Sequence, residues 1–243
     1  MNTDERVTNV LRVAVANNFN FTKRELEALD DLGWDKTKMF VNSNSFVTVT
    51  ADYPSFLTVN PYLDSFVEPT GDLSKVRACR IKVVYNNNLH PSVIEALTWC
   101  QEHSIPALIT LMRFSCKESL FKYSDCPDKY KFKGGYYRLT QAAVDNLVST
   151  IYEEADAHGV SRALINYCDI RGLGCPSCGN CARLAFPEIT GDCNVYGINL
   201  SASGDDGRCI FHCPDCWAKK LQKIGRYLTM DKISQNTKQK GKK

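Results

Sequence analysis

The sequence predicts an α/β fold, in which a small parallel sheet with helices forms a half barrel or an open sandwich. Strand and helix patterns alternate through the middle of the chain in the order β-α-β-α-β, which implies right-handed crossovers and parallel strands. One strand pattern, Ala107 to Met112, is continuously apolar, as expected for a strand buried on both faces. A stretch rich in cysteine then predicts a loop-rich metal-binding segment after the sheet.

Four parts are expected along the chain. The first, 1–75, should contain both helices and strands, and the α/β core should follow over 76–167. The cysteine-rich segment should occupy 168–217, before a basic tail over 218–243.

In the first part, apolar residues at helical spacing (Val7, Val10 and Leu11) predict a helix over 3–17. A capping box from Thr22 to Glu25 predicts the start of a second helix. Runs of β-branched and aromatic residues predict strands over 46–50 and 56–59.

The core should consist of three strands and two helices. The strands are expected over 80–85, 107–112 and 163–167, and the helices over 91–103 and 140–158. Residues 115–138, between the second strand and its helix, are too many for a simple loop and predict an insertion rich in aromatic residues and lysine.

Eight of the twelve cysteines have spacings typical of metal ligands: Cys168, Cys175, Cys178, Cys181, Cys193, Cys209, Cys213 and Cys216. A C-x2-C turn directs both sulfurs to one point, and four such sulfurs satisfy a structural zinc ion or a 4Fe-4S cluster. One pairing joins Cys175 and Cys178 with Cys213 and Cys216. The other four cysteines would then form a second site or partly stay free, and the spacing does not decide between these connectivities.

The cysteines also bear on the compartment. The first residues lack the basic-then-apolar pattern of a signal peptide, and no stretch approaches the length of a membrane span. We therefore expect a cytoplasmic (intracellular) protein with no membrane partner. There, clustered cysteines serve metal or redox chemistry more often than disulfides.

Substrate contacts are expected at the carboxyl end of the sheet, where parallel α/β folds gather their sites. Asn86 and His90 follow the first core strand, and Arg113 follows the second. His90 also immediately precedes Pro91, so it could instead shape the helix entry. The chain has no P-loop, dinucleotide fingerprint, H-E-x-x-H or G-x-S-x-G motif.

Nucleic acid is the second expected partner. The net charge of +3 is uneven, because 218–243 carry nine Lys or Arg against one acid and therefore +8, which leaves about −5 for the rest. Within the insertion, basic and aromatic side chains alternate, as on surfaces that stack bases and contact phosphates. The candidate residues are Lys129, Tyr130, Lys131, Lys133, Arg138, Lys219 and Lys220. The same pattern fits an edge hairpin around Gly134-Gly135, and the tail fits a solvated terminus.

The C-x3-C-x2-C spacing from Cys209 to Cys216 resembles the cluster-binding motif of the radical S-adenosylmethionine superfamily. The segment from Arg80 to Arg113 is similar to a strand–helix–strand unit of that family's partial barrel. The ending Cys213-Pro-Asp-Cys216-Trp217 resembles some phage-encoded cysteine-cluster relatives. The resemblance implies a 4Fe-4S cluster and S-adenosylmethionine as cofactors. The family places its triplet after the first barrel strand, whereas here only 27 residues follow Cys216.

Two hypotheses follow. The leading one is an iron–sulfur protein that resembles a reduced or diverged member of that family. The alternative is a non-enzymatic protein in which zinc folds the cysteine segment and the basic residues bind nucleic acid.

Overall fold

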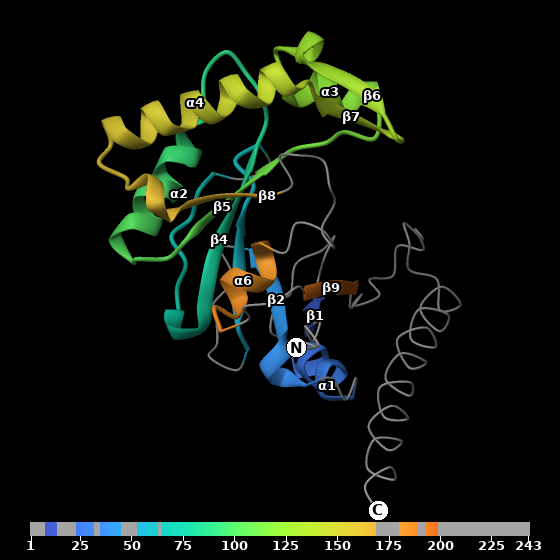
Figure 1. Ribbon diagram of the computed structural model, residues 1–243, viewed down its shortest axis with the longest axis vertical. Helices are drawn as coiled ribbons and strands as arrows, with labels where there is room; N and C mark the ends of the chain where they lie inside the picture. Colours follow the sequence, from blue (N-terminus) through green and yellow to red (C-terminus); the bar gives the residue numbers. More distant parts are fainter. Residues whose placement is uncertain are drawn as a thin grey trace, which may run out of the picture. The chain divides into compact units, whose positions relative to one another are not determined.

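The computed structural model describes residues 8–13, 23–31, 35–44, 53–62, 65–168, 180–188 and 193–198, all within one compact unit. The predicted α/β fold is confirmed, because parallel strands form one sheet that curls into a half-barrel and carries helices on its faces (Figure 1). The predicted cysteine-rich segment lies mostly outside the described residues.

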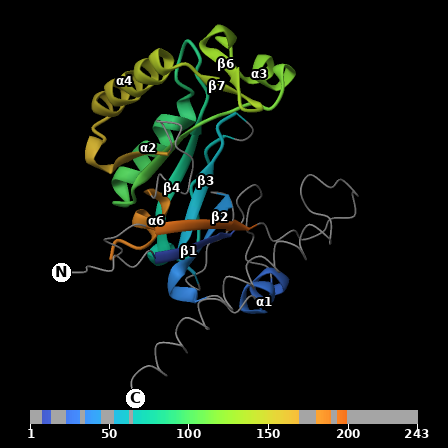
Figure 2. The same ribbon diagram turned by 45° about the vertical axis from the view of Figure 1, so that its right-hand side comes forward.

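Seven described strands form the sheet in the order β8-β5-β4-β3-β2-β1-β9, and every neighbouring pair is parallel. Their bounds are β1 Thr8–Val13, β2 Met39–Asn44, β3 Ser55–Val59, β4 Val76–Val83, β5 Ala107–Leu111, β8 Ile165–Cys168 and β9 Cys193–Ile198. Six of them follow one another in chain order, and β9 lies along β1 at one edge (Figure 2). The strands of the predicted N-terminal part and of the predicted core thus share one sheet.

The described α-helices are α1 Lys23–Asp31, α2 Pro91–Glu102, α3 Lys117–Tyr123, α4 Gln141–Ala157 and α6 Asn180–Ala185. The helices predicted over 91–103 and 140–158 are confirmed as α2 and α4. Local chemistry explains their starts: His90 Nδ1 accepts from the Ser92 backbone N–H, and Thr140 Oγ1 accepts from that of Ala143. None of the helices in the described ranges is long and apolar enough to cross a membrane.

The two faces of the sheet bury different layers. On the convex face, odd-numbered residues of β4 and β5, such as Ile81 and Ile109, pack with α2 and α4 in the larger core. On the concave face, even-numbered residues such as Phe56 and Leu108 pack against α6, through Ala182 and Phe186. The cysteine-bearing helix therefore lies inside the half-barrel.

The helix predicted over 3–17 is wrong for its described part, because 8–13 form strand β1. Val10, Leu11 and Val13 are all buried, so the strand shows no polar alternation, and three apolar residues over so few positions fit either period. Strands β2 and β9 were not predicted. The strand predicted over 46–50 lies outside the described residues, and that over 56–59 is confirmed as β3.

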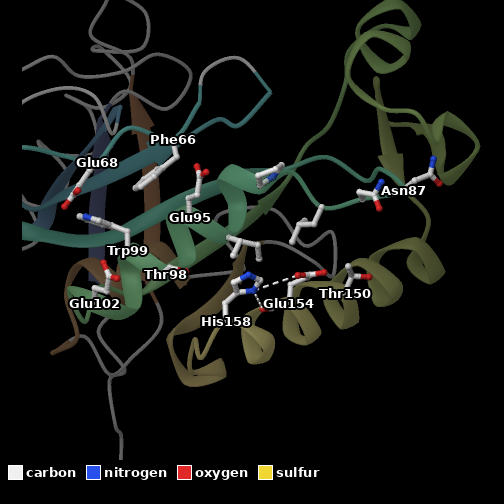
Figure 3. Close-up of a pocket in the computed structure, with 14 residues that line it drawn as sticks. Phe66, Glu68, Asn87, Glu95, Thr98, Trp99, Glu102, Thr150, Glu154 and His158 are labelled. Atoms are coloured by element: carbon white, nitrogen blue, oxygen red, sulfur yellow. Dashed lines mark hydrogen bonds and ion pairs between the residues drawn. The ribbon is translucent and has the colours of Figure 1, made fainter.

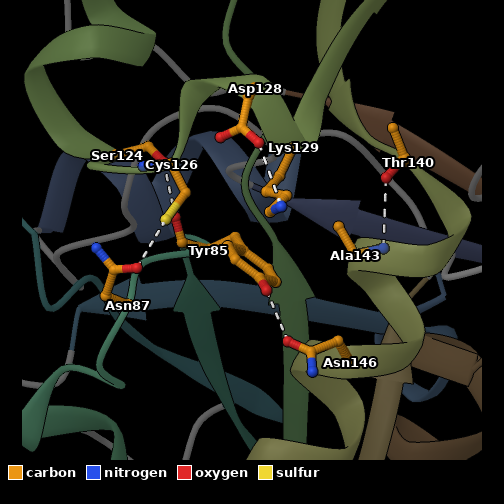
Figure 4. A network of polar contacts seen from close by, with 9 residues as sticks. All are labelled: Tyr85, Asn87, Ser124, Cys126, Asp128, Lys129, Thr140, Ala143 and Asn146. Atoms are coloured by element: carbon orange, nitrogen blue, oxygen red, sulfur yellow. Dashed lines mark hydrogen bonds and ion pairs between the residues drawn. The ribbon is translucent and has the colours of Figure 1, made fainter.

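The insertion contains α3 and a hairpin of β6 (Tyr130–Lys133) and β7 (Tyr136–Leu139), which turns at Gly134 and Gly135. Both glycines have positive φ, which a hairpin turn of this kind requires. Figure 4 shows how Tyr85, two residues after the end of β4, joins the insertion and α4: its carbonyl accepts from Ser124 Oγ of the insertion, and its Oη donates to Asn146 Oδ1 of α4, both over 2.6 Å.

Candidate functional site

The carboxyl-end half of the concave face is the candidate site. Lys82 of β4, Thr110 of β5 and Cys168 of β8 are register partners, so they form one row across three neighbouring strands. Arg80 lies two residues earlier in β4, on the same face. Towards the amino ends of the strands this face becomes apolar and is covered by α6.

Cys168 and Cys181 come together on this face although thirteen positions separate them in the sequence. Cys168 ends β8, and α6 starts directly beside it, because Asn180 Nδ2 donates to the Tyr167 carbonyl over 2.7 Å. The Cys168 side chain hydrogen-bonds to Cys181, whose own side chain is buried at 6% exposure. The end of β8 and the start of α6 therefore bring the two cysteines to one place.

Arg80 reaches from β4 to the cysteine pair. Its side chain is 4% exposed, donates from Nη1 to Asn42 Oδ1 over 2.8 Å and from Nη2 to Cys181 Sγ over 3.4 Å. Asn42 is fixed in turn, because its Nδ2 donates to the Val13 carbonyl over 3.1 Å. The guanidinium also lies over the Phe56 ring. Four strands and α6 thus hold one buried charge in place.

The site is electropositive. The hydrogen bond from Cys168 and then the charges of Arg80 and Arg12 lower the pKa of the Cys181 thiol, which favours the thiolate despite its burial. Burial, followed by the charges of Arg80 and Arg12, lowers the pKa of Lys82. None of the seven strands contains Asp or Glu. These cations are therefore not offset by a carboxylate from the sheet.

None of the other predicted metal ligands lies beside Cys168 and Cys181 in the part of the chain that the structure describes. Cys175, Cys178, Cys209, Cys213 and Cys216 lie outside the described residues. Cys193 begins β9, at the opposite edge of the sheet from Cys168 and at the amino end of its strand. Within the described ranges, no group of three or more His, Cys, Asp or Glu side chains could hold a metal ion.

The remaining described cysteines have structural surroundings. Cys79 and Cys100 are buried together in the convex core, where a hydrogen bond from Cys79 and burial raise the pKa of Cys100. Cys126 is directed at Asn87 Oδ1 over 3.4 Å in the network that anchors the insertion. Cys116 donates to Ser119 Oγ at the start of α3.

The three predicted substrate contacts lie beyond the strand ends but not in one cluster. Asn86 fastens the insertion, since its Oδ1 accepts from the Asp125 backbone N–H over 2.9 Å and its Nδ2 donates to the Tyr123 carbonyl. His90 caps α2 and packs edge-on to Tyr62. Arg113 follows β5 and is exposed.

The predicted nucleic-acid residues divide into two groups. Tyr130 is buried, and its hydroxyl accepts from the Tyr85 backbone N–H over 2.9 Å, so its ring is not available for stacking. Lys131 and Lys133 are exposed on the hairpin, Arg138 is partly buried, and Lys129 pairs with Asp128 over 3.2 Å. Lys219 and Lys220 lie outside the described residues.

A separate cavity of about 670 Å³ lies among the loops and helices of the convex side (Figure 3). It is acidic, because Glu68, Glu95, Glu102 and Glu154 line it, and Phe66 and Trp99 supply an aromatic wall. None of the site residues that were predicted from the sequence lines this cavity.

Sequence reasoning did not identify Arg80, Lys82 and Asn42 as site residues. A signal was present for two of them: Arg80 and Lys82 are two residues apart in a strand whose other residues, apart from Arg77, are apolar, which puts two charges on one face of a largely buried strand. Asn42 carried no comparable signal, because β2 itself was not predicted.

No protein-family model matches the chain, and no curated protein does. Among solved structures, the chain is similar to one described as the crystal structure of Streptococcus suis SuiB, with a TM-score of 0.34 and 15% sequence identity. That similarity covers 74% of this chain and 41% of SuiB, so the chain spans well under half of that protein's length.

Proposed function

We propose that this protein is a thiolate metalloprotein that binds an iron–sulfur cluster at the carboxyl end of its half-barrel. The observation that carries the proposal is the meeting of Cys168 and Cys181 on the concave face. Two cysteines that approach from β8 and from α6 supply half of a four-sulfur ligand set. The lowered thiol pKa of Cys181 is consistent with this role, since the thiolate is the form that binds metal.

The short sequence separation of Cys175 and Cys178 from Cys181 supports these two cysteines as the other half of the ligand set. Cys178 is three residues from Cys181, so their Cα atoms are at most about 11 Å apart. Cys175 is three residues further, in the C-x2-C-x2-C run. A connection that starts at Cys168 and ends at Cys181 keeps both intervening cysteines within reach of the pair. We therefore assign the first ligand set to Cys168, Cys175, Cys178 and Cys181.

The donor chemistry suits a cluster. Four thiolates bring four negative charges, and the nearby Arg80 and Arg12 offset part of them in a partly buried site. Cys209, Cys213 and Cys216 would provide a second set, and their spacing is the one that resembles the S-adenosylmethionine-binding cluster. S-adenosylmethionine is accordingly the cofactor that we propose to test on the reconstituted protein.

The test is metal analysis of the full chain purified without oxygen, as wild type and as three variants. Cys168→Ser and Cys181→Ser should each lose the metal of the first set. Cys100→Ala is the matched control, because Cys100 is equally buried but lies in the convex core. Equal metal loss in all three variants, or no loss in the first two, would contradict the ligand assignment.

The second candidate function, nucleic-acid binding, is favoured by one observation on the hairpin. Phe132 is 61% exposed and Tyr136 is 44% exposed, and Tyr136 is the register partner of the exposed Lys133. Exposed aromatic rings on a hairpin that also carries lysines can stack on unpaired bases while the lysines contact phosphates. Binding to a single-stranded oligonucleotide, followed as the salt concentration rises, tests this function independently of the metal.

A further inference from the structure

Three cations share the concave face without a carboxylate from the sheet. Arg12 and Arg80 both act on Lys82, and both act on Cys181, so all of these groups lie within electrostatic reach of one another. Grouping like charges on a partly buried face is unfavourable for the folded chain. Such a concentration of positive charge is typical of a surface that receives an anion.

Lys82 is the cation that remains available. It is partly buried and makes no hydrogen bond or ion pair with any residue that the structure describes. Arg80, by contrast, is held by Asn42 and Cys181 and contributes its charge from a fixed position. An ammonium group that has no partner among the described residues, beside a fixed guanidinium, is suited to a ligand that arrives from solution.

The neighbouring strand adds a second donor. Thr110 is the register partner of Lys82 on the neighbouring strand, and the backbones of adjacent strands are about 4.8 Å apart. Its Oγ1 is buried and has no hydrogen-bond partner within the described part of the chain. A buried hydroxyl without a partner costs free energy, and a ligand oxygen next to Lys82 would satisfy it.

We propose that Lys82 and Thr110 bind a phosphate group of a small-molecule ligand, with Arg80 and Arg12 supplying additional positive charge. A phosphate monoester carries up to two negative charges and three oxygens that accept hydrogen bonds from different directions. That matches an ammonium and a hydroxyl on adjacent strands with guanidinium groups nearby. A planar carboxylate is served fully by one bidentate arginine, and Arg80 is already engaged.

The site does not depend on the proposed metal. Cys168 continues the row of Lys82 and Thr110, so a bound phosphate would lie beside the cysteines, but no step of the argument needs a cluster to be present. The two proposals therefore fail separately: loss of metal without loss of phosphate binding, or the reverse, identifies which one is wrong.

The experiment is calorimetric titration of the full chain at low salt with inorganic phosphate, AMP and adenosine. Phosphate and AMP should bind and adenosine should not; AMP that binds more tightly than phosphate would identify a nucleotide as the source of the group. Lys82→Met should weaken phosphate binding by at least about tenfold. Lys75→Ala, an exposed lysine before the start of β4, is the matched control and should bind as wild type does.

The melting temperature is a second readout, which shows whether Lys82→Met still folds. Lys82→Met removes an unfavourable charge, so the variant should melt at a higher temperature than the wild type while no longer responding to phosphate. Absence of phosphate binding by the wild type would overturn the proposal. Equal weakening in Lys82→Met and Lys75→Ala would also overturn it, because it would assign the binding to general surface charge.

Discussion

Arg80 donates a hydrogen bond to the sulfur of Cys181 across 101 positions of sequence, at 3.4 Å. This contact joins β4, an inner strand of the sheet, to α6, the helix that carries Cys181. Cys181 is therefore positioned by a side chain of the sheet as well as by its own helix, α6.

Arg80→Met should therefore loosen the site in two ways. It removes the buried hydrogen bond that Arg80 donates to Asn42 Oδ1, so we expect the free energy of unfolding to fall by about 1–3 kcal/mol in urea denaturation. Arg80 would also be an outer partner of a metal ligand, and its loss should lower metal affinity about 10–100-fold in competition with a chelator.

Arg80→Lys separates charge from geometry. It keeps the positive charge but cannot hold Asn42 and Cys181 in one planar fork. Metal affinity equal to that of the wild type in both Arg80 variants would show that this side chain does not position the cysteine.

Lys82 should make stability depend on pH with a definite sign. Burial, and then the charges of Arg80 and Arg12, lower its pKa in the folded chain, so between that pKa and the normal lysine value the unfolded chain binds more protons. Charged Lys82 therefore destabilises the fold below its folded pKa, and this penalty decreases as pH rises from the folded pKa to the normal lysine pKa. The stability advantage of Lys82→Met over the wild type should be largest near neutral pH and should shrink towards pH ~10. An advantage that is constant across this range in denaturation curves would argue against a buried, charged Lys82.

Tyr130 should act as an anchor of the insertion and not as a base-stacking residue. Tyr130→Phe deletes the acceptor of the Tyr85 backbone N–H, so we expect a loss of about 1 kcal/mol in the free energy of unfolding. Tyr136→Phe, at an exposed position of the same hairpin, is the control and should change stability very little. A similar loss of unfolding free energy in both variants would show that the buried hydrogen bond of Tyr130 does not stabilise the insertion.

The exposed aromatic and basic side chains of the hairpin predict a salt-dependent affinity for single-stranded nucleic acid. Phe132→Ala should weaken binding by about 1–3 kcal/mol without changing the salt dependence, because stacking is not ionic. Lys131→Ala and Lys133→Ala should each reduce the slope of log affinity against log salt by about 0.7. Fluorescence anisotropy with a labelled oligonucleotide measures both quantities, and no binding at low salt would remove this candidate function.

The amphipathic, capped helices α2 and α4 and the apolar strand β5 could be predicted from the sequence because their periodicity and caps agree. Strand β1 could not, because Val10 and Leu11 are buried on opposite faces and leave no polar alternation to detect. The cysteine spacing indicated metal ligands. It could not show that Cys168 and Cys181 meet inside the half-barrel, since that depends on α6 returning to the end of β8.

Arg80 shows why the candidate site could not be fully predicted from the sequence. Its strand was predicted, yet its role depends on partners in β2 and α6 that are far away in the sequence. Asn86 and His90 were predicted as substrate contacts from their place after β4, and in the described structure both are engaged in local fastening. Residue type and strand position placed these residues beyond the carboxyl ends of the strands, and only the tertiary contacts show that Asn86 and His90 make local structural hydrogen bonds.

The most direct test of the central claim is the absorption spectrum and metal content of the full chain purified without oxygen. A thiolate-bound cluster predicts a brown protein with a broad band near ~400 nm and iron in multiples of about four per chain. Added S-adenosylmethionine can then be tested for a change in that spectrum. A colourless protein that contains zinc and no iron would contradict the iron–sulfur proposal and leave the cysteines with a structural role.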